Sequence, residues 1–247
     1  MIIQHNISAI NSYRNLGINQ SALSKNLEKL SSGYKINRAG DNAAGLAISE
    51  SMRSQINGLN QASANAKDAI GLIKTAEGAL SEVHSMLQRM TTLAEQAANG
   101  TYNTVARGNI QEEYKALTKE IKRISENADF NGIKPLTTGK EMTMTFQIGP
   151  TSGETITVDK EDIYGKTVTA AMSLKLSVQN DAKNALKTIK TAIDDVSTYR
   201  AKLGAAQNRL EHTVKSLDIM SENITEAESR IRDTDMADEI TAFTKNN

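Results

Sequence analysis

The feature that most constrains the fold is a long apolar repeat in the C-terminal part of the chain. From Ala182 onward, small and aliphatic residues recur in alternating steps of three and four, and only Thr213 breaks the series. A heptad pattern sustained for about seven repeats indicates a helix that packs in a coiled coil. At 1.5 Å per residue this helix would be about 75 Å long, too long for an ordinary globular domain. The seam positions are Ala185, Ile189, Ala192, Val196, Tyr199, Leu203, Ala206, Leu210, Leu217, Met220, Ile224, Ala227 and Ile231.

Two stretches nearer the N-terminus carry the same period. Residues 44–98 hold a seam with one polar exception, Ser63, and Asn99-Gly100 supplies the stop signal. A shorter helix follows and ends before Asn131-Gly132 and Pro135. Because the connection is short, we expect these helices to pack antiparallel. The two seams comprise Met52, Ile56, Leu59, Ala66, Ile70, Ile73, Ala76, Leu80, Val83, Leu87, Met90, Ala94 and Ala97, then Ile110, Tyr114, Leu117, Ile121, Ile124 and Ala128.

Residues 3–32 form another helix with an apolar stripe, followed by a linker over residues 33–43. A helix with a single apolar stripe needs tertiary packing for stability. Its partner must be either the last residues of the chain or another subunit, which suggests a rod that polymerises. The stripe contains Ile3, Ile7, Ile10, Tyr13, Leu16, Leu23, Leu27 and Leu30.

The middle of the chain changes character. Met142 to Ile148 alternates apolar and polar residues, Gly149 to Gly153 reads as a turn, and Thr155 to Val158 alternates again, which predicts a β-hairpin. The expected fold class is mainly α, an elongated antiparallel helical bundle or coiled coil formed by the N- and C-terminal segments, with a small β-hairpin insert. The expected segments are 1–43, 44–135, 136–172, 173–235 and 236–247.

Composition excludes several function classes. The 247 residues contain no Cys, and 29 Lys and Arg balance 29 Asp and Glu. The absence of Cys removes disulfides and thiolate sites, and the balanced charge argues against a nucleic-acid partner. No apolar run reaches the about 18 residues of a membrane span, and the N-terminus lacks the features of a cleaved signal peptide.

Nothing in the sequence predicts a cofactor or a metal site. No phosphate-binding or dinucleotide-binding glycine motif occurs, and His5, His84 and His212 are far apart, with no ligand at zinc spacing. An acidic group near the C-terminus lacks the Gly and the final Glu of a calcium loop, so it reads as a solvated helix end. Its members are Asp233, Asp235, Asp238 and Glu239.

Several ordered motifs carry a family resemblance. Residues 30–48, Leu-Ser-Ser-Gly-Tyr-Lys-Ile-Asn-Arg-Ala-Gly-Asp-Asn-Ala-Ala-Gly-Leu-Ala-Ile, resemble the N-terminal signature of bacterial flagellin. Residues 203–210 and 228–237 are similar to its C-terminal signature. The resemblance covers nearly the whole chain except the middle. Further matching segments are 58–66, 75–80, 87–90 and 129–132.

The resemblance implies a structural subunit of the flagellar filament and not an enzyme. Its partners would be other flagellin subunits, the flagellar type III export apparatus and its export chaperone, and the filament cap and junction proteins. The product would be extracellular, secreted without a cleaved signal peptide. The chain departs from the family at Asp41-Asn42, where two acids are usual, and at Asn247, beyond which a further apolar stretch is usual. We therefore expect the 247-residue chain to stay monomeric.

The resemblance also implies recognition by the host Toll-like receptor for flagellin. The positions that match the recognised patch are Arg89, Leu93 and Glu113, with Gln88 and Gln96 beside them. Leu93 follows Arg89 by four residues, so the two share a helix face, and Arg is enriched in binding hot spots. Spacing alone favours a simpler interpretation, in which Arg89, Leu93 and Glu113 are ordinary surface positions that make intrahelical pairs.

Three other functions remain open as alternatives. A hook–filament junction protein shares the terminal signatures, but its linker usually has Pro at the position of Ala43. A signalling coiled coil would need a transmembrane segment or a site for a partner kinase. A helical-bundle enzyme would need carboxylates or His pairs at metal spacing in its seams.

Overall fold

The computed structural model describes residues 6–137, 143–161, 165, 169–172 and 174–247. The chain divides into two compact units. We call Met1–Asn60 with Asp218–Asn247 the terminal unit, and Gln61–Leu217 the central unit. The elements are α1 (Ile7–Ser32), α2 (Ala43–Ala98), α3 (Thr104–Asn127), β1 (Thr143–Gln147), β2 (Thr155–Asp159), α4 (Thr169–Met172), α5 (Gln179–Arg232) and α6 (Met236–Asn246).

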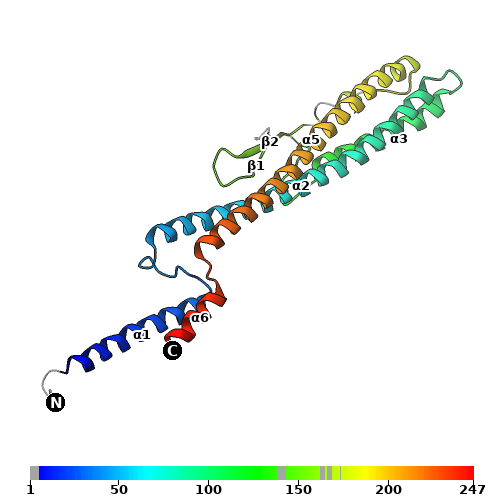
Figure 1. The fold of residues 1–247 in the computed structure, drawn as a ribbon. Coiled ribbons are helices and arrows are strands. Elements are labelled where there is room, and N and C mark those ends of the chain that lie inside the picture. The colour runs from blue at the N-terminus through cyan, green and yellow to red at the C-terminus, as the bar shows by residue number, and fades with distance from the viewer. Residues whose placement is uncertain (1–5, 138–142, 162–164, 166–168, 173) are drawn as a thin grey trace. The chain divides into compact units, whose positions relative to one another are not determined.

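In the central unit α2, α3 and α5 lie side by side and share one apolar core (Figure 1). Most predicted seam positions are buried: Leu80, Leu87 and Leu203 are fully enclosed, as are the seam alanines Ala94 and Ala185. Alanine lets helices approach closely, but each alanine buries little apolar area. The core therefore extends along the helices as a long, continuous seam. The mainly helical fold with a small antiparallel sheet is confirmed.

Additional positions of α2 are buried beyond the predicted seam. Ala69, Leu72 and Leu93 are each at most 2% exposed. The reason is that α2 packs against α3 and α5 at once, so its apolar stripe must be wider than a two-helix seam.

Two tyrosines supply the large aromatic contacts of this core. The Tyr199 hydroxyl donates to the Pro135 carbonyl at 3.2 Å, which joins α5 to the loop after α3. Burial raises the pKa of Tyr114 and of Tyr199 to about 12, so both phenols stay protonated across the physiological range.

The predicted hairpin is present as an antiparallel pair in the register Thr143↔Asp159 to Gln147↔Thr155. Met142, which we expected at its start, lies outside the described residues. Met144, Ile156 and Val158 are buried and join the helical core. The short helix α4 was not predicted from the sequence.

A tight turn after α3 brings the chain to the hairpin. Phe130 and Ile133 exchange backbone hydrogen bonds of 3.0 Å, while Asn131 and Gly132 have φ values of 52° and 82°. Gly132 tolerates this conformation, and Asn is among the few other residues that do. The Asp129 carboxylate accepts from the Gly132 N–H at 3.0 Å and so fixes the turn.

Beyond Leu217 the predicted seam of α5 is wrong at Met220 and only partly buried at its later positions. Met220 is 47% exposed, and the later positions Ile224, Ala227 and Ile231 are only half-buried. Within the terminal unit, polar contacts join the two helices instead. Ser221 donates to Asn60 and Ser49 donates to Glu228, each at 2.9 Å. The heptad period continues here with half-buried apolar positions.

We predict that Leu203→Asp destabilises the central unit by roughly 3 kcal/mol or more, because a charge would be buried without a partner. Thermal unfolding followed by circular dichroism measures the change. Ala205→Asp, on the exposed face of α5, is the matched control and should cost less than about 1 kcal/mol. Equal melting of the two variants would contradict the packing at Leu203.

Candidate interaction surfaces

The N-terminal half of α1 presents an apolar stripe to solvent. The helix begins at the cap residue Asn6, whose side chain accepts from the Ala9 N–H at 3.1 Å. Exposed fractions along the stripe are 64% for Ile7, 51% for Ile10 and 62% for Leu16. Ile3, which we expected in the same stripe, lies outside the described residues.

The C-terminal half of α1 is partly covered by α6. Leu23 and Leu30 are half-buried, whereas Leu27 stays 57% exposed. The sequence allowed two partners for this stripe, the last residues of the chain or another subunit. Helix α6 covers the C-terminal part of the stripe.

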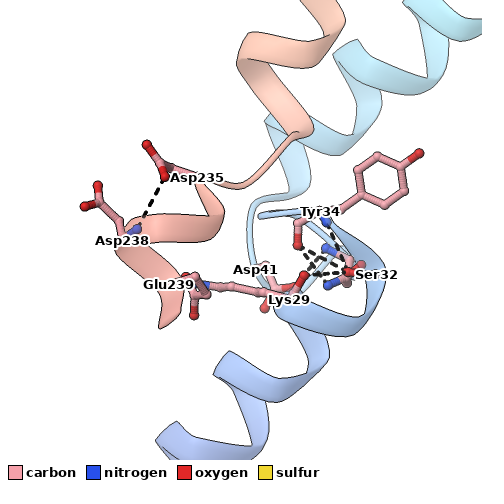
Figure 2. A network of polar contacts seen from close by, with 8 residues as sticks. Lys29, Ser32, Tyr34, Asp41, Asp235, Asp238 and Glu239 are labelled. Atoms are coloured by element: carbon pink, nitrogen blue, oxygen red, sulfur yellow. Dashed lines mark hydrogen bonds and ion pairs between the residues drawn. The ribbon is translucent and has the colours of Figure 1, made fainter. Parts of the chain in front are cut away.

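Asn26 is the buried polar residue of this contact. With its amide nitrogen facing the acceptors, Asn26 donates to Glu239 at 2.9 Å and accepts from Asn246 at 3.1 Å. Lys29 reaches the Glu239 carboxylate at 3.4 Å (Figure 2). Asp235 caps α6 by accepting from the Ala237 and Asp238 N–H groups. The acidic residues therefore begin and anchor α6, and the described residues contain no group of three possible metal ligands.

Within the terminal unit, backbone hydrogen bonds join the segment that follows α1 to the segment at the end of α5. The Lys35 N–H donates to the Arg232 carbonyl at 2.7 Å, and the Thr234 N–H donates to the Gly33 carbonyl at 3.0 Å. The Arg232 guanidinium lies over the Tyr34 ring, 4.6 Å from its centroid, a favourable cation–π contact. These bonds fix the first linker to the end of α5.

The linker also carries its own cap for α2. Asp41 accepts from the Arg38 N–H at 3.1 Å, and this backbone hydrogen bond lowers the pKa of the Asp41 carboxyl. Asn42 accepts from the Gly45 N–H at 2.9 Å, as a helix cap does. An Asn at this departure from the family pattern therefore has a structural role.

The central unit brings Arg89 of α2 and Glu113 of α3 together. The Arg89 Nε and Nη2 atoms both lie 2.8 Å from Glu113 Oε1. Both side chains are about half exposed, at 51% and 44%. Exposed ion pairs of this kind contribute about 0–1 kcal/mol to stability, so the pair is available to a partner at little cost.

The other members of the predicted patch differ in exposure. Gln88 is exposed and bonds His84 Nε2 at 3.0 Å, and Gln96 is half-buried. Leu93 is only 1% exposed and lies in the core. Contrary to our prediction, it offers no apolar contact at the surface, because this side of α2 faces its neighbouring helices.

Comparison with known proteins identifies the family. The sequence profile for the bacterial flagellin N-terminal helical region matches residues 3–141, and that for the C-terminal helical region matches residues 186–247. The chain belongs to the bacterial flagellin family. It is 49% identical to a flagellin of Halalkalibacterium halodurans over all of this chain and 91% of that protein. It is 48% identical to a flagellin of Bacillus subtilis over all of this chain and 92% of that protein.

Solved structures share the fold of this flagellin chain. Bacillus cereus flagellin superposes with a TM-score of 0.57 at 32% identity, over 62% of this chain and 88% of that one. A protein described as a flagellar hook-associated protein of Vibrio parahaemolyticus gives a TM-score of 0.65, over 78% of this chain and all of that one. Its 12% identity supports a common fold alone. Flagellins are structural proteins. Among the described helices of this chain, none is long and apolar enough to cross a membrane.

Sequence reasoning missed Asn26 and the contact of Arg232 with Tyr34. Asn26 follows the stripe residue Leu23 by three positions, so a polar residue on an otherwise apolar face was the available signal. The Arg232 contact had no such signal, because its partner is distant in sequence.

We predict that Asn26→Ala loosens α6, because the Glu239 and Asn246 side chains lose a buried partner. An 11-residue helix is marginal alone, so amide hydrogen exchange in α6 should accelerate on the order of tenfold. Asn19→Ala, on the exposed side of α1, is the control and should leave exchange in α6 unchanged. Equal α6 protection in both variants would show that Asn26 does not anchor the helix.

Proposed function

We propose that this flagellin chain is a structural subunit of the bacterial flagellar filament and that the apolar stripe of α1 forms contacts between subunits. The observation that carries the proposal is the exposure of Ile7, Ile10 and Leu16 on a capped helix. Fully burying one such side chain stabilises a contact by about 1.5–3 kcal/mol. Contiguous apolar surface of this kind marks an interaction site.

Relatives support the same function. A protein of Treponema maltophilum, 44% identical over the whole of this chain, is named a flagellar filament core protein. Balanced charge suits a subunit that stacks beside many copies of itself, because little repulsion accumulates. In this proposal the product is extracellular, and export runs through the flagellar type III apparatus.

A junction protein of the hook and filament is the alternative function. The relatives at 48–49% identity are named flagellins, whereas the hook-associated structure shares only the fold. A junction protein would usually have Pro at position 43, where this chain has Ala43 at the start of α2. These observations favour the filament subunit.

We predict that Ile10→Asp combined with Leu16→Asp abolishes filaments on the cells that make this protein. Each substitution would bury an unpaired carboxylate in the subunit contact. Electron microscopy of the cells measures filament number. The exported monomer in the medium, measured by immunoblot, separates failed assembly from failed export.

The matched control is Asn11→Asp combined with Asn19→Asp, which adds the same charge at exposed polar positions of the same helix. Filaments should persist in this variant. Filaments of normal length and number with the stripe variant would refute the assignment of the contact to α1.

We infer that the Arg89–Glu113 pair centres a surface recognised by the host Toll-like receptor for flagellin. The pair is exposed, is held by two helices of a packed core, and has Gln88 beside it. A rigid site limits the entropy lost on binding. Leu93 contributes here by packing under the surface and not by touching the receptor.

We predict that exchanging the two charges, Arg89→Glu with Glu113→Arg, weakens receptor binding by about 10- to 30-fold, since an Arg hot spot contributes about 2 kcal/mol. The exchange keeps an ion pair within the chain, so thermal unfolding should be unaltered. Surface plasmon resonance with the receptor ectodomain measures the affinity.

The control exchanges another exposed pair on α3, Glu120 with Arg123, whose atoms approach to 2.6 Å. Its exchange should leave receptor affinity as in the unmodified chain. If exchanging Arg89 and Glu113 has no larger effect than this control, the contact lies elsewhere on the protein.

A further inference from the structure

A groove runs along the outer edge of β1 in the central unit. One hollow of about 500 Å³ lies between α2, the turn after α3 and β1, and is continuous with a second through Leu72, Ile133 and Phe146. Leu72 and the rings of Phe130 and Phe146 make its walls apolar. Ile133, which is 42% exposed, forms part of the rim. We call this hollow the β1 groove.

The edge of β1 that faces the groove carries backbone groups that pair with no strand among the described residues. The Ile148 N–H donates to the Glu154 carbonyl at 2.9 Å, and the ladder alternates from there. The N–H and C=O groups of Thr143 and Thr145 therefore point away from β2, and both residues line the groove. The Gln147 carbonyl points the same way and accepts from Asn65 at 3.3 Å. An open strand edge beside an apolar wall is a template for a further strand.

The groove carries opposite charges at its two ends. Asp68 of α2 lies at the end where β1 finishes, while Lys134 and Lys160 lie at the end where β1 begins. Within the part of the chain that the structure describes, none of these three side chains has an ion-pair partner. Aromatic rings beside Asp68 also favour a cation there.

We propose that the β1 groove binds an extended segment of another protein as a third strand on β1. Antiparallel pairing is the more stable arrangement, and it runs the added segment from the Asp68 end to the lysine end. The segment would begin with a basic residue over Asp68 and end with an acidic residue over Lys134 and Lys160. Apolar side chains at alternate positions between them would face the groove.

Within the residues that the structure describes, a second copy of this chain does not offer that segment. Among the described residues outside helices, the one stretch of that length that begins with a base and ends with an acid is 35–41, and it bends and turns from Arg38 to Asp41 instead of running extended. Ile36 within it is 4% exposed, and Lys35 is bonded to the end of α5. Charge complementarity therefore points to a different protein as the partner.

The test uses a fluorescein-labelled heptapeptide, Arg-Thr-Val-Thr-Val-Thr-Glu, and the whole chain. Fluorescence anisotropy should show saturable binding. Asp68→Lys should weaken it at least tenfold, and a peptide that begins with Glu should restore binding to this variant. Lys134→Glu should likewise weaken binding of the original peptide, and a peptide that ends with Lys should restore binding to this variant. Proline at both the third and fourth peptide positions removes a donor from either edge, so this peptide should not bind.

Glu82→Lys is the matched control, because Glu82 is an exposed acid on the same helix and outside the groove. It should bind the peptide as the unmodified chain does. Equal affinity of the Asp68→Lys variant, or no saturable binding of any peptide, would overturn the proposal. Loss of peptide binding as the protein concentration rises would show a second copy in the groove and would also overturn it.

Discussion

Close packing of helices through small side chains is the interaction on which the central unit depends. The alanines of α2 and α5 let the helices approach, and leucines and isoleucines between them supply the apolar area. Tyr114 and Tyr199 are the fully buried tyrosines among the described residues of this unit, and each has one polar group to satisfy. Because the seam is continuous, α3 and the hairpin need only pack against its sides. The Arg89–Glu113 pair and the β1 groove are both held in place by these secondary contacts.

The periodicity of the sequence predicts the helices well and the hairpin almost completely. The sequence prediction fails where one helix has two neighbours: the spacing from Arg89 and the family resemblance placed Leu93 on the recognised surface, but a second packing direction buries it. It fails again after Leu217, where a heptad continues while Ser49 and Glu228 make the contact. Periodicity shows on which face of a helix a residue lies, but it does not show which part of the protein that face contacts.

The two candidate surfaces differ in how far they can be predicted from the sequence. Arg89 and Glu113 lie on helices joined by a short turn, so their proximity follows from local geometry. The β1 groove depends on the direction of backbone groups and on a turn with left-handed residues, neither of which appears in residue spacing. Asn26 belongs to the same class, because its partners come from the other end of the chain.

The pairing of α1 with α6 has a consequence for the order of folding. Lys29 and Glu239 are separated by 210 positions in sequence, and such distant contacts form late because a long loop must close first. A chain that emerges from one end can complete the hairpin and the α2–α3 turn early, since these contacts are local. The terminal unit must wait for its last helix. Until then α1 stays uncovered along its whole stripe, and the arrival of α6 ends that exposure only for the C-terminal half of the helix.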